Sequence, residues 1–94
     1  MNDKKSLEDM IPEMEFKIIR ELAIMAEQDP DDDVKKSARQ SLSRRYQGQI
    51  FNTASFGDSI YVDVLKNNVH DMYYVCDKVD YGLEVPKIDD DFFK

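Results

Sequence analysis

The sequence predicts an all-α fold, a small three-helix domain with a C-terminal tail, and three observations support this prediction. Apolar residues recur at helical spacing in residues 11–28 and again in residues 59–79, and a charged segment with a clear helix start lies between them. The chain has 94 residues, enough for a single domain with one modest core. We expect residues 1–94 to form that domain, with a frayed N-terminus at 1–6 and an acidic-aromatic tail at 83–94.

The first helix is predicted over residues 11–28. Pro12 suits the first turn of a helix, because the N–H that proline lacks would have no partner there. Asp29-Pro30 ends the helix, since the proline ring clashes with a continuing helix. Ile24 falls on the polar side and is expected to be exposed. The face expected to be buried consists of Met14, Ile18, Ile19, Leu22, Ala23, Met25 and Ala26.

The second helix is predicted over residues 34–47, with Gly48 as its C-terminal stop. Asp31, Asp32 and Asp33 come directly before it, where a carboxylate can cap the helix and favour its positive end. Small residues on the inward stripe let two helix backbones approach closely. That stripe consists of Val34, Ala38, Ser41 and Leu42.

The two helices share a pattern that runs from the end of the first to the middle of the second. It consists of Leu22, Met25, Asp29-Pro30-Asp31, Asp33-Val34-Lys35, Ala38 and Leu42. This pattern resembles a HEAT-repeat hairpin over residues 12–46, with Lys35 where arginine is more usual. Such repeats run about 40–47 residues and normally stack in threes or more, so the chain has room for one repeat and a cap. The resemblance implies a helical hairpin with an interaction role and no activity.

Residues 59–79 have two interpretations. The stretch Ser-Ile-Tyr-Val-Asp-Val at its start has strand composition, and Asn67-Asn68 could form the turn of a hairpin. On a helical wheel, however, most of the apolar residues fall on one half, and no two-residue alternation continues past Leu65. We therefore expect a third amphipathic helix here, preceded by a loop at residues 48–58. The alternative is an α+β fold with a β-hairpin or meander in residues 49–79.

The charge of the chain favours a basic protein as its partner. Thirteen basic residues stand against 20 acidic ones, for a net charge of -7. This balance opposes general affinity for nucleic acid or anionic lipid. The single cysteine, Cys76, cannot form an internal disulfide, and no stretch approaches the roughly 20 apolar residues of a membrane span. We expect a cytoplasmic protein with no membrane association, and the sequence leaves the oligomeric state open.

Catalytic groups are few. His70 stands beside Asp71, as a general base oriented by a carboxylate would, but the chain has no second histidine and no nucleophile motif. Cys76 lies among apolar residues, where a thiol acts as a small hydrophobic group. We therefore expect a protein that is not an enzyme and that binds no cofactor.

One acidic pattern resembles the start of a calcium-binding loop but lacks two residues that such a loop requires. Asp29, Asp31 and Asp33 alternate like the first ligands of a calcium loop. The sixth and twelfth positions of such a loop require glycine and glutamate, and this chain has Val34 and Gln40 there. Helix capping explains the aspartates better, so we predict no metal site.

Two surfaces are candidate binding sites. Acids that steer a basic partner and aromatics that anchor it are mixed in the last third of the chain. The predicted partner-binding residues are Tyr74, Asp77, Asp80, Tyr81, Glu84, Asp89, Asp90, Asp91, Phe92 and Phe93. The second candidate is the outward basic face of the second helix, where Lys35, Lys36 and Arg39 could contact phosphate.

These features predict a small acidic protein-binding module. Its most specific form is an inhibitor or toxin-neutralising immunity protein that binds a basic partner such as a nuclease. The alternatives are a nucleic-acid-linked adaptor that uses the basic face of the second helix, and a phage-encoded regulator of host machinery. The sequence does not separate these possibilities, because it names no partner.

Overall fold

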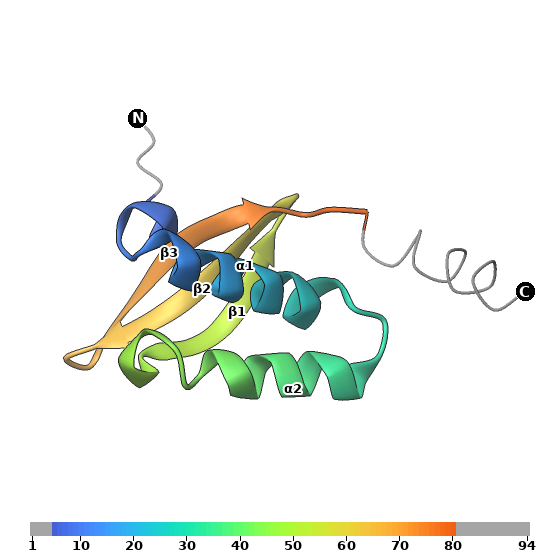
Figure 1. The fold of residues 1–94 in the computed structure, drawn as a ribbon, viewed down its shortest axis with the longest axis horizontal. Helices are drawn as coiled ribbons and strands as arrows, with labels where there is room; N and C mark the ends of the chain where they lie inside the picture. The colour runs from blue at the N-terminus through green and yellow to red at the C-terminus, as the bar shows by residue number, and fades with distance from the viewer. Residues whose placement is uncertain (1–4, 81–94) are drawn as a thin grey trace, which may run out of the picture.

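A computed structural model describes residues 5–80, which form an α+β fold with two helices packed on one face of a three-stranded antiparallel sheet (Figure 1). The all-α prediction is therefore wrong, and the predicted tail at 83–94 lies outside the described residues. The elements follow in the order η1 (Leu7–Asp9), α1 (Glu13–Gln28), α2 (Asp32–Leu42), η2 (Tyr46–Gly48), β1 (Ile50–Phe56), β2 (Ser59–Lys66) and β3 (Val69–Asp77).

Helix α1 forms where the sequence predicts it, and its buried face agrees with the predicted one only in part, at Ile19, Ala23 and Ala26. The buried residues are Phe16, Ile19, Ala23 and Ala26. Met14, expected inside, is 77% exposed, and Ile24, expected outside, packs against the core. The helix carries apolar residues on more than one side, so the wheel alone did not fix which side would meet the sheet.

Helix α2 begins at Asp32, two residues before the predicted start, and it also ends early. Asp31 caps it, because its carboxylate accepts a hydrogen bond from the Asp33 N–H at 2.8 Å. The helix ends at Leu42, five residues before the predicted end, where the Ser43 hydroxyl donates to the Gln40 carbonyl at 2.7 Å. Such local side-chain bonds compete with continued helix. Gly48 therefore lies in η2 and is not the helix stop.

The HEAT-like prediction is also wrong for the chain as a whole. Helices α1 and α2 do pack against each other as a hairpin. In a HEAT array such a hairpin packs against further helices. Here it packs against strands, so the pattern from Leu22 to Leu42 describes a helical hairpin without the repeat architecture.

The segment expected to be a third helix is a β-hairpin. Strands β2 and β3 pair antiparallel and are joined by Asn67 and Asn68, both at positive φ (53° and 65°), as a type I′ hairpin turn requires. The register shifts between Ile60 and Tyr61, so Val75 on β3 has no partner residue. The bulge and the turn interrupt the two-residue alternation of apolar residues along β2 and β3. The apolar residues are therefore spaced in the sequence much as they would be on one face of a helix.

Residues 48–58, expected to be a loop, contain strand β1. It pairs antiparallel with β2 through a two-residue turn at Gly57-Asp58, where Gly57 has φ 63°. The three strands thus form a meander in the order β1-β2-β3.

At each of the two edge strands, a backbone group has a hydrogen-bond partner outside the β1–β2–β3 ladder. On the β3 side, the Tyr74 N–H donates to the Lys5 carbonyl at 2.7 Å, and Ser6 forms a parallel bridge with Tyr74. On β1, the Thr53 N–H donates to the Asn52 side chain at 2.9 Å, so this amide is already satisfied locally.

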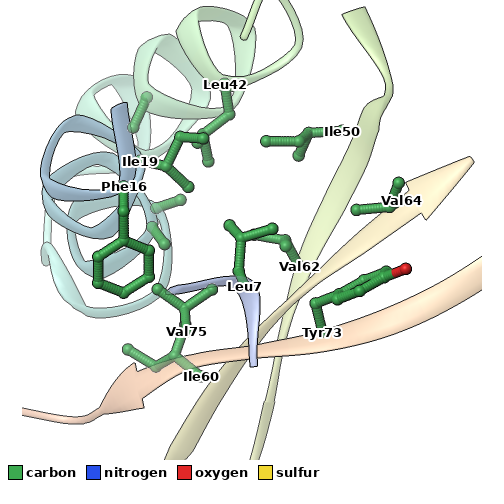
Figure 2. Close-up of a cluster of buried hydrophobic side chains, with 13 residues drawn as sticks. Leu7, Phe16, Ile19, Leu42, Ile50, Ile60, Val62, Val64, Tyr73 and Val75 are labelled. Atoms are coloured by element: carbon green, nitrogen blue, oxygen red, sulfur yellow. The ribbon is translucent and has the colours of Figure 1, made fainter. Parts of the chain in front are cut away.

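The core lies between the helices and the inner face of the sheet (Figure 2). Strand β2 alternates strictly, with Ile60, Val62 and Val64 buried. Leu7 of η1 closes one side of the core and is fully buried. Burying one such side chain stabilises the fold by about 1.5–3 kcal/mol. The inner face is thus fully used for packing, and the outer face remains available.

Candidate functional site

The face of the sheet that points away from the helices carries exposed aromatic and apolar side chains. We call it the open face. Strand alternation, cross-strand pairing and ring contacts place on it Phe51, Asn52, Ala54, Phe56, Ser59, Tyr61, Asp63, Leu65, His70, Met72, Tyr74 and Asp77. Phe51 is 63% exposed, Phe56 is 59% exposed and Met72 is 37% exposed. Side chains of this size on one surface are typical of a contact site.

Three aromatic rings cross the open face beside the Gly57-Asp58 turn. The rings of Phe56 and Tyr61 have centroids 5.3 Å apart, and those of Tyr61 and Tyr74 have centroids 5.7 Å apart, both edge-to-face at 75°. Each strand contributes one ring to this row. Edge-to-face packing holds such rings in place while leaving parts of their faces uncovered.

A carboxylate ends the row. Asp77 Oδ1 accepts a hydrogen bond from the Tyr74 hydroxyl at 2.8 Å and a longer one from the Ser59 hydroxyl at 3.4 Å. The bond to Asp77 is the main cause that raises the pKa of Tyr74 to about 12, so the phenol stays protonated and donates. We call Phe56, Ser59, Tyr61, Tyr74 and Asp77 the aromatic–carboxylate cluster.

The opposite end of the open face pairs an imidazole with a carboxylate. His70 Nδ1 lies 3.0 Å from both oxygens of Asp63, and the ring meets Phe51 edge-to-face with centroids 5.1 Å apart. His70 is exposed, and its partner is Asp63, not the neighbouring Asp71. Asp71 pairs with Lys5 at 3.3 Å instead.

The sheet is acidic as well as aromatic. Residues 50–77 contain the acids Asp58, Asp63, Asp71 and Asp77 and a single lysine, Lys66. Coulomb attraction at this surface therefore favours an approaching cation and disfavours a phosphate.

A second polar cluster joins the two layers. Glu27 on α1 accepts hydrogen bonds from the Thr53 and Ser55 hydroxyls of β1, each at 2.5 Å, and from Arg39 of α2 at 3.2 Å. Burial alone would raise the pKa of Glu27, but the bonds from Ser55, Thr53 and Arg39 together lower it below its ordinary value. With every partner satisfied within the fold, this cluster stabilises the packing of helices on sheet.

The same cluster weakens the predicted phosphate site. Lys35, Lys36 and Arg39 do lie along one side of α2, around a shallow hollow. Arg39 is directed to Glu27 and to the Thr53 hydroxyl, at 3.3 Å from Nε, so its guanidinium serves the interior contact. Lys35 and Lys36 are left to form the basic surface.

The structure brings together two of the residues predicted to bind a partner. Tyr74 and Asp77 are hydrogen-bonded on the open face, and Asp80 is exposed at the end of the described segment. The other predicted residues lie outside the described range: Tyr81, Glu84, Asp89, Asp90, Asp91, Phe92 and Phe93.

The sequence prediction missed the rest of the open face. Phe51, Phe56, Tyr61 and Asp63 were assigned to a loop or to a helix. The strand composition of residues 59–64 and the Gly57-Asp58 pair were the signals that could have found them.

Neither metal nor nucleophile chemistry is supported by the described residues. No group of three or more His, Cys, Asp or Glu side chains within residues 5–80 could hold a metal ion. Cys76 is partly buried, and burial raises the pKa of its thiol, which disfavours the reactive thiolate.

Comparison with known proteins adds no identity to this picture. No protein-family model, no curated protein and no solved structure matches the chain. None of the helices within residues 5–80 has both the length and the apolar content needed to cross a membrane.

Proposed function

We propose that this protein is a binding module for a basic protein partner and that the open face of the sheet is its contact surface. The observation that carries the proposal is the combination of exposed aromatic rings with carboxylates on one face of a packed sheet. Phe51 and Phe56 stand exposed there, and Asp63 and Asp77 lie between and beside the rings.

The two kinds of side chain have different tasks in such a contact. Aromatic residues supply most of the affinity, because they bury large areas with little loss of rotamer freedom. Carboxylates speed the encounter with a basic surface and select against acidic partners. A sheet backed by two helices holds both in fixed positions, so little ordering is needed on binding.

The most specific form of the proposal is an inhibitor or immunity protein that covers a positively charged active site, such as that of a nuclease. The acidic sheet supports this form, because its carboxylates resemble in sign the phosphates that such a site attracts. Any binding that occludes the site would then block the partner's activity.

Single-stranded nucleic acid is the main rival as the ligand of the open face. Aromatic rings on a sheet can stack on bases, but such platforms are paired with a basic groove along the backbone. Here the sheet carries Asp58, Asp63, Asp71 and Asp77, while Lys35 and Lys36 lie on α2 in the helical layer. The charges near the rings therefore favour a protein.

Affinity capture tests the proposal. The full chain, immobilised and exposed to an extract of its native host, should retain a stoichiometric basic protein at low salt and lose it at high salt. Phe56→Ser should abolish capture, whereas Met14→Ser, a matched change at an exposed residue of α1, should leave it intact. Capture that Phe56→Ser does not reduce would contradict the proposal, as would tight binding of a single-stranded oligonucleotide to the open face.

A further inference from the structure

We infer that the aromatic–carboxylate cluster is a subsite for one arginine side chain of the basic partner. This inference rests on the proposed function and sharpens it, since it names the side chain that the partner would insert. It is built on the geometry of Asp77 and the three rings beside it.

The carboxylate at the end of the row is oriented and accessible. Two hydroxyls, from Tyr74 and Ser59, donate to Oδ1 of Asp77, which fixes the carboxylate beside the rings. Asp77 is exposed, and no lysine or arginine within residues 5–80 forms an ion pair with it, although Lys78 is its neighbour in sequence. An incoming cation can therefore add a charge-assisted hydrogen bond without displacing one.

The rings supply the second half of the subsite. A cation over the face of an aromatic ring, within about 6 Å of its centroid, is attracted by the π-electrons. Tyr61 lies in the middle of the row, with its ring 5.3 Å from that of Phe56 and 5.7 Å from that of Tyr74. The Tyr74 hydroxyl is bonded to Asp77, so a guanidinium bound at this carboxylate has the Tyr74 ring beside it.

The same strand already shows this arrangement with a cation of the chain itself. Lys5 Nζ lies 3.3 Å from Asp71 and 5.8 Å from the centroid of the Tyr73 ring. A carboxylate and a tyrosine of β3 thus hold an ammonium between them. Asp77 and Tyr74, further along the strand, again place a carboxylate beside a tyrosine, and the Asp77 carboxylate is exposed to an incoming cation.

Arginine fits the subsite better than lysine. The guanidinium is planar, is less strongly hydrated than an ammonium, and can stack on a ring while two of its N–H groups bind a carboxylate. The Asp63 end of the open face offers no equivalent subsite, because the His70 imidazole already contacts both oxygens of that carboxylate.

Titration of the isotope-labelled full chain, followed by amide NMR signals, tests the inference. The probes are N-acetyl-arginine amide, the matching lysine compound and the matching citrulline compound, which keeps the shape of arginine without its charge. Arginine should shift the signals of Tyr61, Tyr74 and Asp77 at several-fold lower concentration than lysine does, and citrulline should not shift them. Equal shifts from all three probes, or arginine shifts centred elsewhere, would overturn the inference.

Two variants and a control locate the site. Asp77→Asn keeps the size of the side chain and should weaken the arginine response at least several-fold, and Tyr61→Leu should weaken it through loss of the ring. Asp71→Asn is the control, because the Asp71 carboxylate forms an ion pair with Lys5. This variant should leave the arginine response unchanged. An unchanged response in Asp77→Asn would refute the subsite.

The two proposals fail in distinguishable ways. If capture of a basic partner depends on Phe56 but arginine amide leaves the cluster unshifted, the subsite is wrong and the binding function stands. If arginine amide binds at the cluster but no partner is captured, the proposed function fails and the subsite stands.

Discussion

Glu27 on α1 and Ser55 on β1 are joined by a 2.5 Å hydrogen bond, in which the hydroxyl donates to a carboxylate that is nearly enclosed by the fold. The same carboxylate takes bonds from Thr53 and Arg39, so one side chain links α1, α2 and the first strand. The packing of the helices on the sheet is therefore stabilised by polar contacts as well as by the apolar core.

Removing the charge of Glu27 should destabilise the protein. Glu27→Gln leaves Arg39 without its charged partner and replaces an acceptor of two hydroxyls with an amide. We expect a loss of about 1–3 kcal/mol in the free energy of unfolding at neutral pH, measured by urea denaturation. Glu13→Gln, which removes an exposed acid of α1, is the control and should change the value by less than about 0.5 kcal/mol.

The contribution of Glu27 should also depend on pH. Its bonds lower its pKa below the ordinary value of 4.5, so its stabilising effect is complete above that value and is lost as the pH falls through the lower, folded-state pKa. The difference in unfolding free energy between the wild type and Glu27→Gln should therefore shrink between pH 6 and pH 3. A difference that stays constant over this range would show that the charge of Glu27 is not what stabilises the contact.

The Asn67-Asn68 turn offers a direct test of strand against helix. Asn68 has φ 65°, a value at which glycine has no steric cost, so Asn68→Gly should leave stability unchanged or raise it by up to about 1 kcal/mol. In a helix, the same change would cost several tenths of a kcal/mol. Asn68→Val, which is strained at positive φ, should destabilise the hairpin by about 1–2 kcal/mol. Thermal unfolding of the two variants distinguishes the folds by the order of their melting temperatures.

The buried face of α1 can be checked by a matched pair of truncations. Ile19→Ala removes a fully buried side chain and should cost about 2–5 kcal/mol, whereas Met14→Ala removes one that is 77% exposed and should cost less than about 0.5 kcal/mol. Chemical denaturation measures both. Similar losses in the two variants would mean that the helix is rotated from the orientation described above.

The bond between Tyr74 and Asp77 should be visible in a tyrosine titration. The pKa of Tyr74 is raised to about 12, chiefly because its hydroxyl donates to Asp77. Asp77→Asn removes the negative charge and should move the pKa of Tyr74 back toward its ordinary value of 10.0. Ring-carbon NMR shifts of Tyr74, followed against pH in the wild type and in Asp77→Asn, report this value.

The sequence predicted the helical half of the fold because the signals there are local. Asp31 caps α2, Asp29-Pro30 separates the helices, and Ala38 and Leu42 pack inward as expected. The face of α1 was predicted in part: Ile19, Ala23 and Ala26 are buried as expected, whereas Met14 is exposed, because the exact orientation depends on which apolar side meets the sheet.

The sheet was missed because its alternation is interrupted. The turn at Asn67-Asn68 and the bulge at Val75 shift the side chains of β3 into a spacing that a helix would also produce. The candidate site followed the same pattern: Tyr74 and Asp77 were selected for their chemistry alone. Phe56 and Tyr61 join them through strand pairing, which the strand composition of residues 59–64 and the Gly57-Asp58 pair suggest but whose register they do not define.

The contacts at the two borders of the sheet restrict how other chains can approach. Lys5 and Ser6 occupy part of the outer border of β3, and the Asn52 side chain occupies an amide of β1. Each contact removes a backbone group with which a foreign strand could pair, and so disfavours extension of the sheet and the stacking of copies into fibrils at that point. If the open face is the contact surface, as we propose, specificity would then be set by the shape and charge of its side chains and not by backbone groups that every protein shares.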